Sequence, residues 1–209
     1  MERTRTRLWL AVAVLLYVAF LLLDLTHAAD STGVKYLGVL CCLAAALPHS
    51  GTTDGRLVTA ALALTAAADW FLLVLDRHYP VGIALFCVVQ GLYAVRLHRL
   101  RTAAPILLLC RALPLALFPL GAPPLTALAL FYFANLALNA AQSIVRRNVS
   151  RTAAWFCAGL VLLTCCDFCI GLHRLAVCPA AYNAVWLFYL PSQLCIAVSS
   201  MSHTRSSPI

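Results

Sequence analysis

Long apolar runs separated by short polar breaks make up almost the whole chain. A helix needs about 20 mainly apolar residues to cross the hydrocarbon core of a bilayer, and most of the runs approach that length. We predict eight membrane spans, at residues 8–26, 34–48, 57–75, 81–97, 104–120, 124–145, 153–172 and 182–200. The second run is short for a span. The alternation typical of a strand barrel is absent, so the pattern indicates helices, which satisfy their backbone hydrogen bonds internally.

The first run follows basic residues and could be mistaken for a secretory signal. Its apolar stretch of about 18 residues is longer than the roughly 7–15 residues of a usual signal. We therefore expect residues 8–26 to be a true span.

Composition agrees with this pattern. The chain has 209 residues, of which 63% are hydrophobic and 11% charged, whereas a soluble domain carries roughly 25% charged residues. Internal repeats and long loops are absent, so residues 1–209 are expected to form a single transmembrane domain. No soluble domain is left to carry a nucleic-acid partner, and the expected surroundings are the lipid bilayer.

Basic residues predict the orientation, because they gather in cytoplasmic loops. If the N-terminus is cytoplasmic, eleven of the fifteen lie on the inner side, three on the outer side and one, Arg111, within a span. The inner ones are Arg3, Arg5, Arg7, Arg56, Arg96, Arg99, Arg101, Arg146, Arg147, Arg151 and Arg205, and the outer ones are Lys35, Arg77 and Arg174. This bias predicts that both termini are cytoplasmic, and it explains most of the net charge of +8.

Ten cysteines are present, and nine of them lie within the predicted spans. Cys166 and Cys169 have the spacing of a zinc-ligand pair, but a structural zinc site needs a second pair with similar spacing. The sequence has no such pair, so we interpret the cysteines as small packing residues and expect neither a metal nor a cofactor.

Two aspartates lie inside predicted spans, where a charged group is costly and usually faces a cavity or a partner. Asp69 and Asp167 each come five or six residues before the outer end of a span. At about 1.5 Å per residue, both are expected roughly 8–9 Å below the outer boundary.

Faces that carry polar residues repeat at helical spacing on three further spans. They consist of Gly82, Phe86, Gln90 and Tyr93; of Tyr132, Asn135, Asn139 and Gln142; and of Tyr189 and Gln193, with Pro191 between the last two. Single polar groups of this kind can simply hydrogen-bond between helices, at about 0.6 kcal/mol each. Two aspartates and several polar faces at similar depth favour a shared polar cavity.

A pair of carboxyl groups in apolar surroundings suits acid-catalysed cleavage. Two neighbouring carboxyls cannot both ionise cheaply there, so the pair supplies a proton donor and an anion. Glycosidic and vinyl ether bonds are cleaved by such pairs. Composition alone does not choose between these substrates.

Five short motifs resemble the YhhN-like membrane proteins, which include the lysoplasmalogenases. They are VKYLG with Lys35, AADWFLL with Asp69, VGIALFCVVQGLY with Gly82, Phe86 and Tyr93, AGLVLLTCCD with Gly159 and Asp167, and FYLPSQLCIA with Tyr189 and Gln193. The resemblance covers most of the chain. It implies an eight-helix bundle that hydrolyses the vinyl ether bond of lysoplasmalogen to a fatty aldehyde and a glycerophospho-ethanolamine or -choline.

Two positions depart from the family pattern. Gln90 stands where the pattern has histidine, and glutamine cannot donate or accept a proton near neutral pH. Cys166 stands where the family has serine. The first departure puts the rate or the specificity of the reaction in question.

We therefore predict an all-α polytopic membrane bundle and a hydrolase of lysoplasmalogen. Asp69 and Asp167 are the predicted catalytic pair, and Lys35 or Arg111 would bind the phosphate of the lysophospholipid. The predicted substrate-binding residues are Lys35, Gln90, Tyr93, Tyr132, Asn135, Tyr189 and Gln193. The alternatives are a non-catalytic lipid-binding protein, a proton-coupled transporter of small molecules, or a purely structural bundle. Arginine outnumbers lysine fourteen to one, which hints at a GC-rich bacterial genome and an inner-membrane location. Head-group preference and oligomeric state stay open.

Overall fold

A computed structural model describes residues 2–98, 105–118 and 120–201 of the chain. Within these ranges all regular secondary structure is helical. The α-helices are α1 (Glu2–Thr26), α2 (Thr32–Ala46), α3 (Thr53–Asp69), α4 (Tyr79–His98), α5 (Pro105–Ala112), α6 (Pro124–Arg146), α7 (Arg151–Arg174) and α8 (Val185–Met201). Four short segments extend them: the 3-10 helices η1 (Leu47–His49), η3 (Leu113–Leu117) and η4 (Pro179–Ala184), and the π-helix η2 (Trp70–Val74). The prediction of an all-α protein is confirmed.

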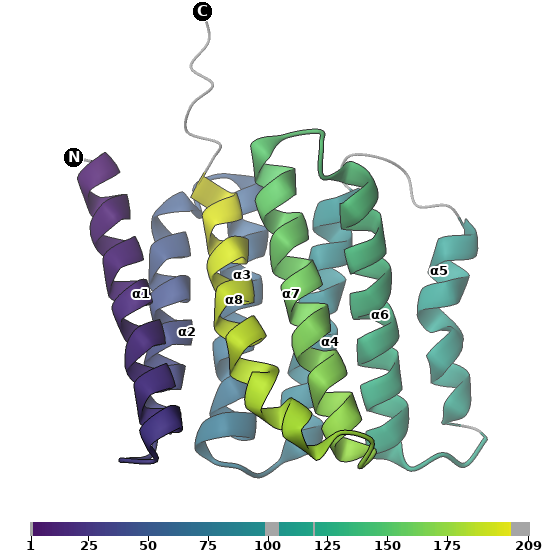
Figure 1. Ribbon diagram of the computed structural model, residues 1–209. Helices are drawn as coiled ribbons and strands as arrows, with labels where there is room; N and C mark the ends of the chain where they lie inside the picture. Colours follow the sequence, from purple (N-terminus) through teal and green to yellow (C-terminus); the bar gives the residue numbers. More distant parts are fainter. Residues whose placement is uncertain (1, 99–104, 119, 202–209) are drawn as a thin grey trace, which may run out of the picture.

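The helices run alternately up and down and lie side by side (Figure 1). Six of them close a ring, in which α2, α3, α4, α6, α7 and α8 each pack against the next and α8 returns to α2 and α3. Helix α1 packs outside α2, and α5 packs outside α6 at the opposite edge (Figure 1). The beginning of α1 and the end of α8 lie at the same end of the bundle (Figure 1).

Six helices in the described part of the chain are long and apolar enough to cross a membrane. They are Thr32–His49, Thr53–Val74, Tyr79–His98, Pro124–Arg146, Arg151–Arg174 and Pro179–Met201. The chain is therefore an integral, multi-pass membrane protein. The predicted span at 34–48 is among the six, because η1 continues α2 to His49.

The predicted first span lies in α1, which has 25 residues and whose fully described apolar part is Ala11–Thr26, and the described part of the predicted fifth span is the apolar helix Ile106–Ala116. In the fifth, α5 changes to the 3-10 helix η3 at Leu113, directly before Pro114. Proline lacks an N–H and its ring clashes with the carbonyl one turn earlier, so the α-helical ladder cannot continue. Six candidate crossings are thus observed, and eight crossings stay a prediction.

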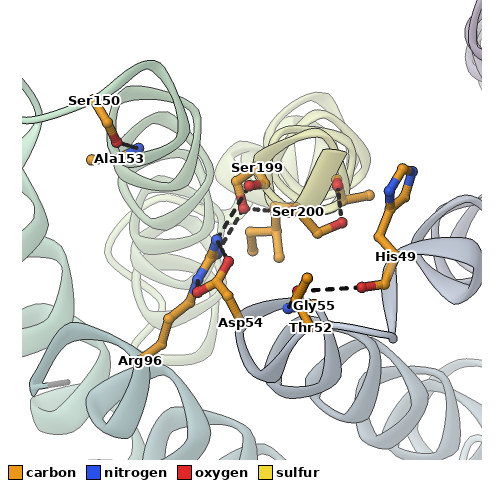
Figure 2. Close-up of polar contacts among 11 residues, drawn as sticks. His49, Thr52, Asp54, Gly55, Arg96, Ser150, Ala153, Ser199 and Ser200 are labelled. Carbon is orange, nitrogen blue, oxygen red and sulfur yellow. Dashed lines mark hydrogen bonds and ion pairs between the residues drawn. The ribbon is translucent and has the colours of Figure 1, made fainter. Parts of the chain in front are cut away.

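Hydroxyl groups cap two of the long helices at the end of the bundle that holds the termini. The Thr52 side chain accepts a hydrogen bond from Gly55 N at 2.9 Å, and the Ser150 side chain accepts one from Ala153 N at 3.0 Å (Figure 2). Such N-caps satisfy backbone donors that have no partner within the helix. They define where α3 and α7 begin.

An ion pair at this same end and its neighbours join four helices (Figure 2). Arg96 of α4 is only 7% exposed, and its Nε and Nη2 donate to the Asp54 carboxylate at 2.8 and 2.7 Å. Its Nη1 donates to Ser199 Oγ of α8 at 2.7 Å, and its guanidinium lies 4.3 Å from the ring centroid of Phe156. Sequence analysis treated Arg96 only as one of the inner basic residues. The structure shows that it connects α3, α4, α7 and α8.

Candidate functional site

Asp69 is the last residue of α3, at the point where the helix widens into the π-helix η2. Such π-helical turns are rare and often occur at functional sites. The Asp69 side chain is 5% exposed, and its Oδ2 accepts a hydrogen bond from the Tyr189 hydroxyl of α8 at 2.6 Å. The carboxyl group is therefore held in the core between α3 and α8.

Asp167 lies on α7 and is half-buried. Its Oδ2 accepts a hydrogen bond from the hydroxyl of Tyr132 on α6. The Tyr132 ring packs against Phe86 of α4, with 5.6 Å between the ring centroids. Asp167 thus has the same kind of partner as Asp69, a tyrosine from the neighbouring helix.

These two aspartate–tyrosine pairs belong to one site. The Asp167 carboxyl is close enough to Asp69 for the two to interact, and the Tyr189 hydroxyl is close enough to interact with Tyr132. The buried Cys166 side chain interacts with both aspartates. We call the four residues Asp69, Tyr132, Asp167 and Tyr189 the acidic site. The structure brings together here the two aspartates and two of the tyrosines that the sequence selected.

Lys35 lies at the edge of this site and already has a carboxylate partner. Its ammonium group is 2.8 Å from Asp24 Oδ2 of α1 and 5.2 Å from the ring centroid of Trp186. Trp186 in turn packs edge-on against Tyr189, with centroids 5.1 Å apart. Lys35 is therefore separated from the acidic site by one aromatic ring.

Gln90 and Asn135 belong to a second polar network, built around Arg111. Arg111 is 8% exposed and donates to Asn135 Oδ1 at 3.0 Å and to Asn139 Oδ1 at 2.7 Å. Asn139 Nδ2 donates to Gln90 Oε1 at 2.9 Å. The amide hydrogens of Asn135 go to the backbone carbonyls of Arg111 and Phe131. These two predicted substrate-binding residues are thus placed beside Arg111.

Tyr93 and Gln193 are buried on the inner faces of α4 and α8. Gln193 lies one helical turn from Tyr189 and donates weakly to Ser192 Oγ at 3.3 Å. Tyr93 packs edge-on against Phe156, with ring centroids 5.4 Å apart. Phe156 also contacts Arg96, so Tyr93 is one aromatic ring from the ion pair, and on its other side it is close enough to Tyr132 to interact with it.

Two aromatic residues beside the acidic site were not selected from the sequence. Trp186 connects Lys35 with Tyr189, and the Tyr36 ring packs against Trp70, the residue after Asp69, with 5.7 Å between centroids. Tyr36 stands in the VKYLG motif next to Lys35. Its position next to Lys35 could have indicated Tyr36 from the sequence. Nothing in the sequence distinguishes Trp186 from other aromatic residues near the ends of spans.

The described residues can also be compared with the ligand sets of metal centres. No group of three or more His, Cys, Asp or Glu side chains gathers there as metal ligands would. The cysteines of the described part are free thiols, most of them partly or fully buried in the helices.

Comparison with known proteins identifies the family. The YhhN family model matches residues 30–200 of the chain. The chain belongs to the YhhN family. The match extends over α2 to α8 and includes the whole acidic site, Lys35 and the Arg111 network, whereas α1 lies outside it. No curated protein and no solved structure matches the chain. The part of this YhhN protein that matches the family is thus the part of the bundle that contains the acidic site and the Arg111 network.

Proposed function

We propose that this YhhN family protein is a membrane hydrolase that cleaves the vinyl ether bond of lysoplasmalogen. The products are a fatty aldehyde and a glycerophospho-ethanolamine or -choline. The acidic site carries the proposal, because two interacting carboxyl groups meet there in apolar surroundings and each is held by a tyrosine. Membership of the YhhN family supports a lysoplasmalogenase-type activity.

The proposed reaction uses the two carboxyl groups as a proton donor and an anion. The protonated carboxyl transfers its proton to the alkenyl carbon β to the ether oxygen, and the electrons of the double bond form the new C–H bond. The remaining carbon becomes an oxocarbenium ion, which the anionic carboxylate stabilises. Water adds to this carbon and gives a proton to that carboxylate. The resulting hemiacetal loses the glycerol oxygen as an alcohol and becomes the aldehyde.

Tyr132 and Tyr189 support this pair by holding it in place. A hydroxyl that donates to a carboxyl oxygen fixes the direction of that group before the substrate arrives. Donors that are already oriented need no reorganisation during the reaction, which is the main source of electrostatic catalysis in dry sites. Asp69 and Asp167 are accordingly the catalytic residues of the proposal, and the tyrosines position them.

The proposed substrate explains why the site lies inside a membrane bundle. A lysophospholipid has one long alkenyl chain and can enter from the bilayer with its head group at the surface. In the proposed topology eight helices cross the bacterial inner membrane, both termini are cytoplasmic, and the acidic site lies near the outer surface. Lys35 is the proposed contact for the phosphate, since it lies at the start of α2 on that side.

The proposal is tested by measuring aldehyde released from lysoplasmalogen by purified protein in detergent. We expect Asp69→Asn and Asp167→Asn each to reduce the release to background. Asp76→Asn is the matched control, because Asp76 also accepts a tyrosine hydroxyl, from Tyr79 at 2.5 Å, but is exposed outside the core. Its backbone has φ of 47°, which asparagine tolerates well.

Two outcomes would contradict the hydrolase. One is folded wild-type protein that releases no aldehyde above background. The other is full activity in both core variants. Proton-coupled uptake of a solute into liposomes, lost in Asp69→Asn or Asp167→Asn, would favour a transporter instead. If Gln90→His restores aldehyde release to an inactive wild type, the glutamine at the family's histidine position is the cause.

A further inference from the structure

The Arg111 side chain is a buried cation that donates hydrogen bonds to two amide groups. It is 8% exposed and donates to Asn135 and Asn139 of α6. Its Nε is buried without a hydrogen-bond partner among the described residues. Helix α5 packs against α6 at the edge of the bundle, so this arginine reaches inwards from the outermost helix.

The guanidinium determines the orientation of two amide groups in succession. Arginine can only donate hydrogen bonds, so the atom of Asn139 that faces it at 2.7 Å is the oxygen. The amide nitrogen of Asn139 therefore points the other way, where it donates to Gln90 Oε1 at 2.9 Å and to the Gln90 carbonyl at 3.0 Å. The oxygen of the Gln90 side chain is thereby occupied, and its Nε2 is turned away from Asn139.

The Gln90 Nε2 group is a donor without a partner. Gln90 is 0% exposed, and its Nε2 has no hydrogen-bond partner in the described part of the chain. A buried N–H group without an acceptor costs free energy. Binding of an oxygen acceptor at Gln90 Nε2 would therefore be favourable. Gln193 Oε1 is a second buried amide atom without a partner there, and it is an acceptor.

Gln193 lies one helical turn from the acidic site, and Gln90 lies one helical turn from Phe86, a ring that packs against the site. Gln90 follows Phe86 by four residues on α4, and Phe86 packs against Tyr132, which holds Asp167. Gln193 follows Tyr189 by four residues on α8, and Tyr189 holds Asp69. Because residues four apart share one face of a helix, Gln193 is on the same face of α8 as Tyr189, and Gln90 is on the same face of α4 as Phe86, which contacts Tyr132.

We propose that Arg111 is a positioning residue that acts through Asn139 to present Gln90 Nε2 as a fixed donor to one oxygen acceptor beside the acidic site. The acceptor is the water consumed in hydrolysis or an oxygen of the substrate. The catalytic consequence rests on the proposed function, whereas the orientation of Gln90 does not.

The orientation can be measured without substrate, because the chain has only three glutamines, Gln90, Gln142 and Gln193. Full-length protein labelled with ¹⁵N-glutamine in detergent gives three side-chain NH₂ pairs by NMR, and single Gln→Leu variants assign them. The decisive comparison is Asn139→Asp against Asn135→Asp. Each places a carboxylate against the same guanidinium, but only Asn139 touches Gln90.

We expect Asn139→Asp to shift the Gln90 NH₂ pair, because a carboxylate cannot donate to Gln90 Oε1 and the amide must turn. Asn135→Asp should leave that pair unchanged, and neither variant should move the Gln193 pair. Arg111→Lys provides a second test that keeps the positive charge but removes the planar donors, and it should also shift the Gln90 pair. An unchanged Gln90 pair in Asn139→Asp, or equal shifts in both aspartate variants, would overturn the proposal.

Two further spectra identify the acceptor. An exchange cross-peak between the Gln90 NH₂ pair and water in substrate-free protein assigns the acceptor as water. A shift of this pair on addition of lysoplasmalogen assigns it as a substrate oxygen. If neither is observed, the proposed donor role is wrong.

Aldehyde release supplies the catalytic test. We expect kcat to fall about tenfold in Asn139→Asp, the equivalent of one lost oriented hydrogen bond, with KM unchanged. The same change in a Gln90→Ala background should cause no further loss, and an additional tenfold loss would contradict action through Gln90. If the wild type releases no aldehyde, the proposed function fails while the NMR comparison still decides the orientation.

Discussion

At the residue scale, tyrosine hydroxyls are the partners that hold both core aspartates. Tyr189 and Tyr132 come from helices other than those of Asp69 and Asp167, and each donates to a single carboxyl oxygen. Every carboxyl therefore keeps its second oxygen available for a proton or for the substrate. A neighbouring lysine or arginine would instead hold both carboxyls as anions, and the pair would lose its acid.

Removing either hydroxyl should weaken the reaction without unfolding the protein. We expect Tyr189→Phe and Tyr132→Phe each to lower kcat/KM by roughly 10–100-fold, because a hydrogen bond to a charged group contributes about 1.5–3 kcal/mol. Rates of aldehyde release measure the effect. Tyr79→Phe is the control, since it removes the same kind of bond from the exposed Asp76. Wild-type rates in both core variants would show that the tyrosines do not position the carboxyls.

At the element scale, close packing of α7 against α8 brings the two halves of the acidic site together. Gly159 of α7 lies directly against α8, where a Cβ atom would come within 3.0 Å of Ser192 O and 3.2 Å of Ile196 N. These are backbone atoms, so they cannot move aside as a flexible side chain would. Gly159 thus determines how near α7, with Asp167, approaches α8, with Tyr189.

Gly159→Ala should separate these helices and lower both stability and activity. The expected loss is about 1–3 kcal/mol, as for other overpacked cores, measured as the free energy of unfolding in mixed micelles. Gly171→Ala is the control on the same helix, because nothing lies within 4 Å of its Cβ position. That variant should be neutral or slightly more stable, since alanine favours a helix over glycine. Equal effects of the two changes would disprove the packing role of Gly159.

The ion pair between Arg96 and Asp54 holds the other end of the bundle. Arg96→Met should destabilise the protein by about 1.5–3 kcal/mol, because it removes the charged hydrogen bonds of Arg96 to Asp54, whose side chain is 26% exposed, and to Ser199. Thermal unfolding in detergent measures the change. Arg56→Met removes an exposed arginine two residues from Asp54 and should have little effect. A similar small effect of Arg96→Met would mean that the pair is dispensable.

At the scale of the whole molecule, the number of crossings determines on which sides of the membrane the termini lie. The start of α1 and the end of α8 lie at the same end of the bundle (Figure 1). An even number of crossings is required for this arrangement to place both termini on one side. The helix formed by α5 and η3 decides the parity, since its described α-helical part covers only Pro105–Ala112 before the 3-10 helix begins.

Reporter fusions in a bacterial host test this topology. A fluorescent protein that matures only in the cytoplasm should be bright at either terminus. Alkaline phosphatase, which is active only outside, should be active when fused after Gly121, between α5 and α6. A dark C-terminal fusion beside a bright N-terminal one would show that one helix, α5 first of all, does not cross.

The sequence by itself predicted the helices, the membrane environment and the two aspartates. Apolar run length and the depth of a charge within a run are local properties, so they can be counted along the chain. The pattern did not predict that the fifth span changes from α-helix to 3-10 helix, because an apolar composition continues through Pro114 whereas the α-helical hydrogen bonds do not.

Only the tertiary structure decided which polar faces meet. Tyr132 and Asn135 lie on the same face of α6, yet Tyr132 contacts Asp167 while Asn135 contacts Arg111. Asp69 finds its partner 120 residues away, in Tyr189. Helical periodicity determines the depth and direction of a side chain but does not identify the helix that it faces. That choice depends on how the whole ring of helices packs.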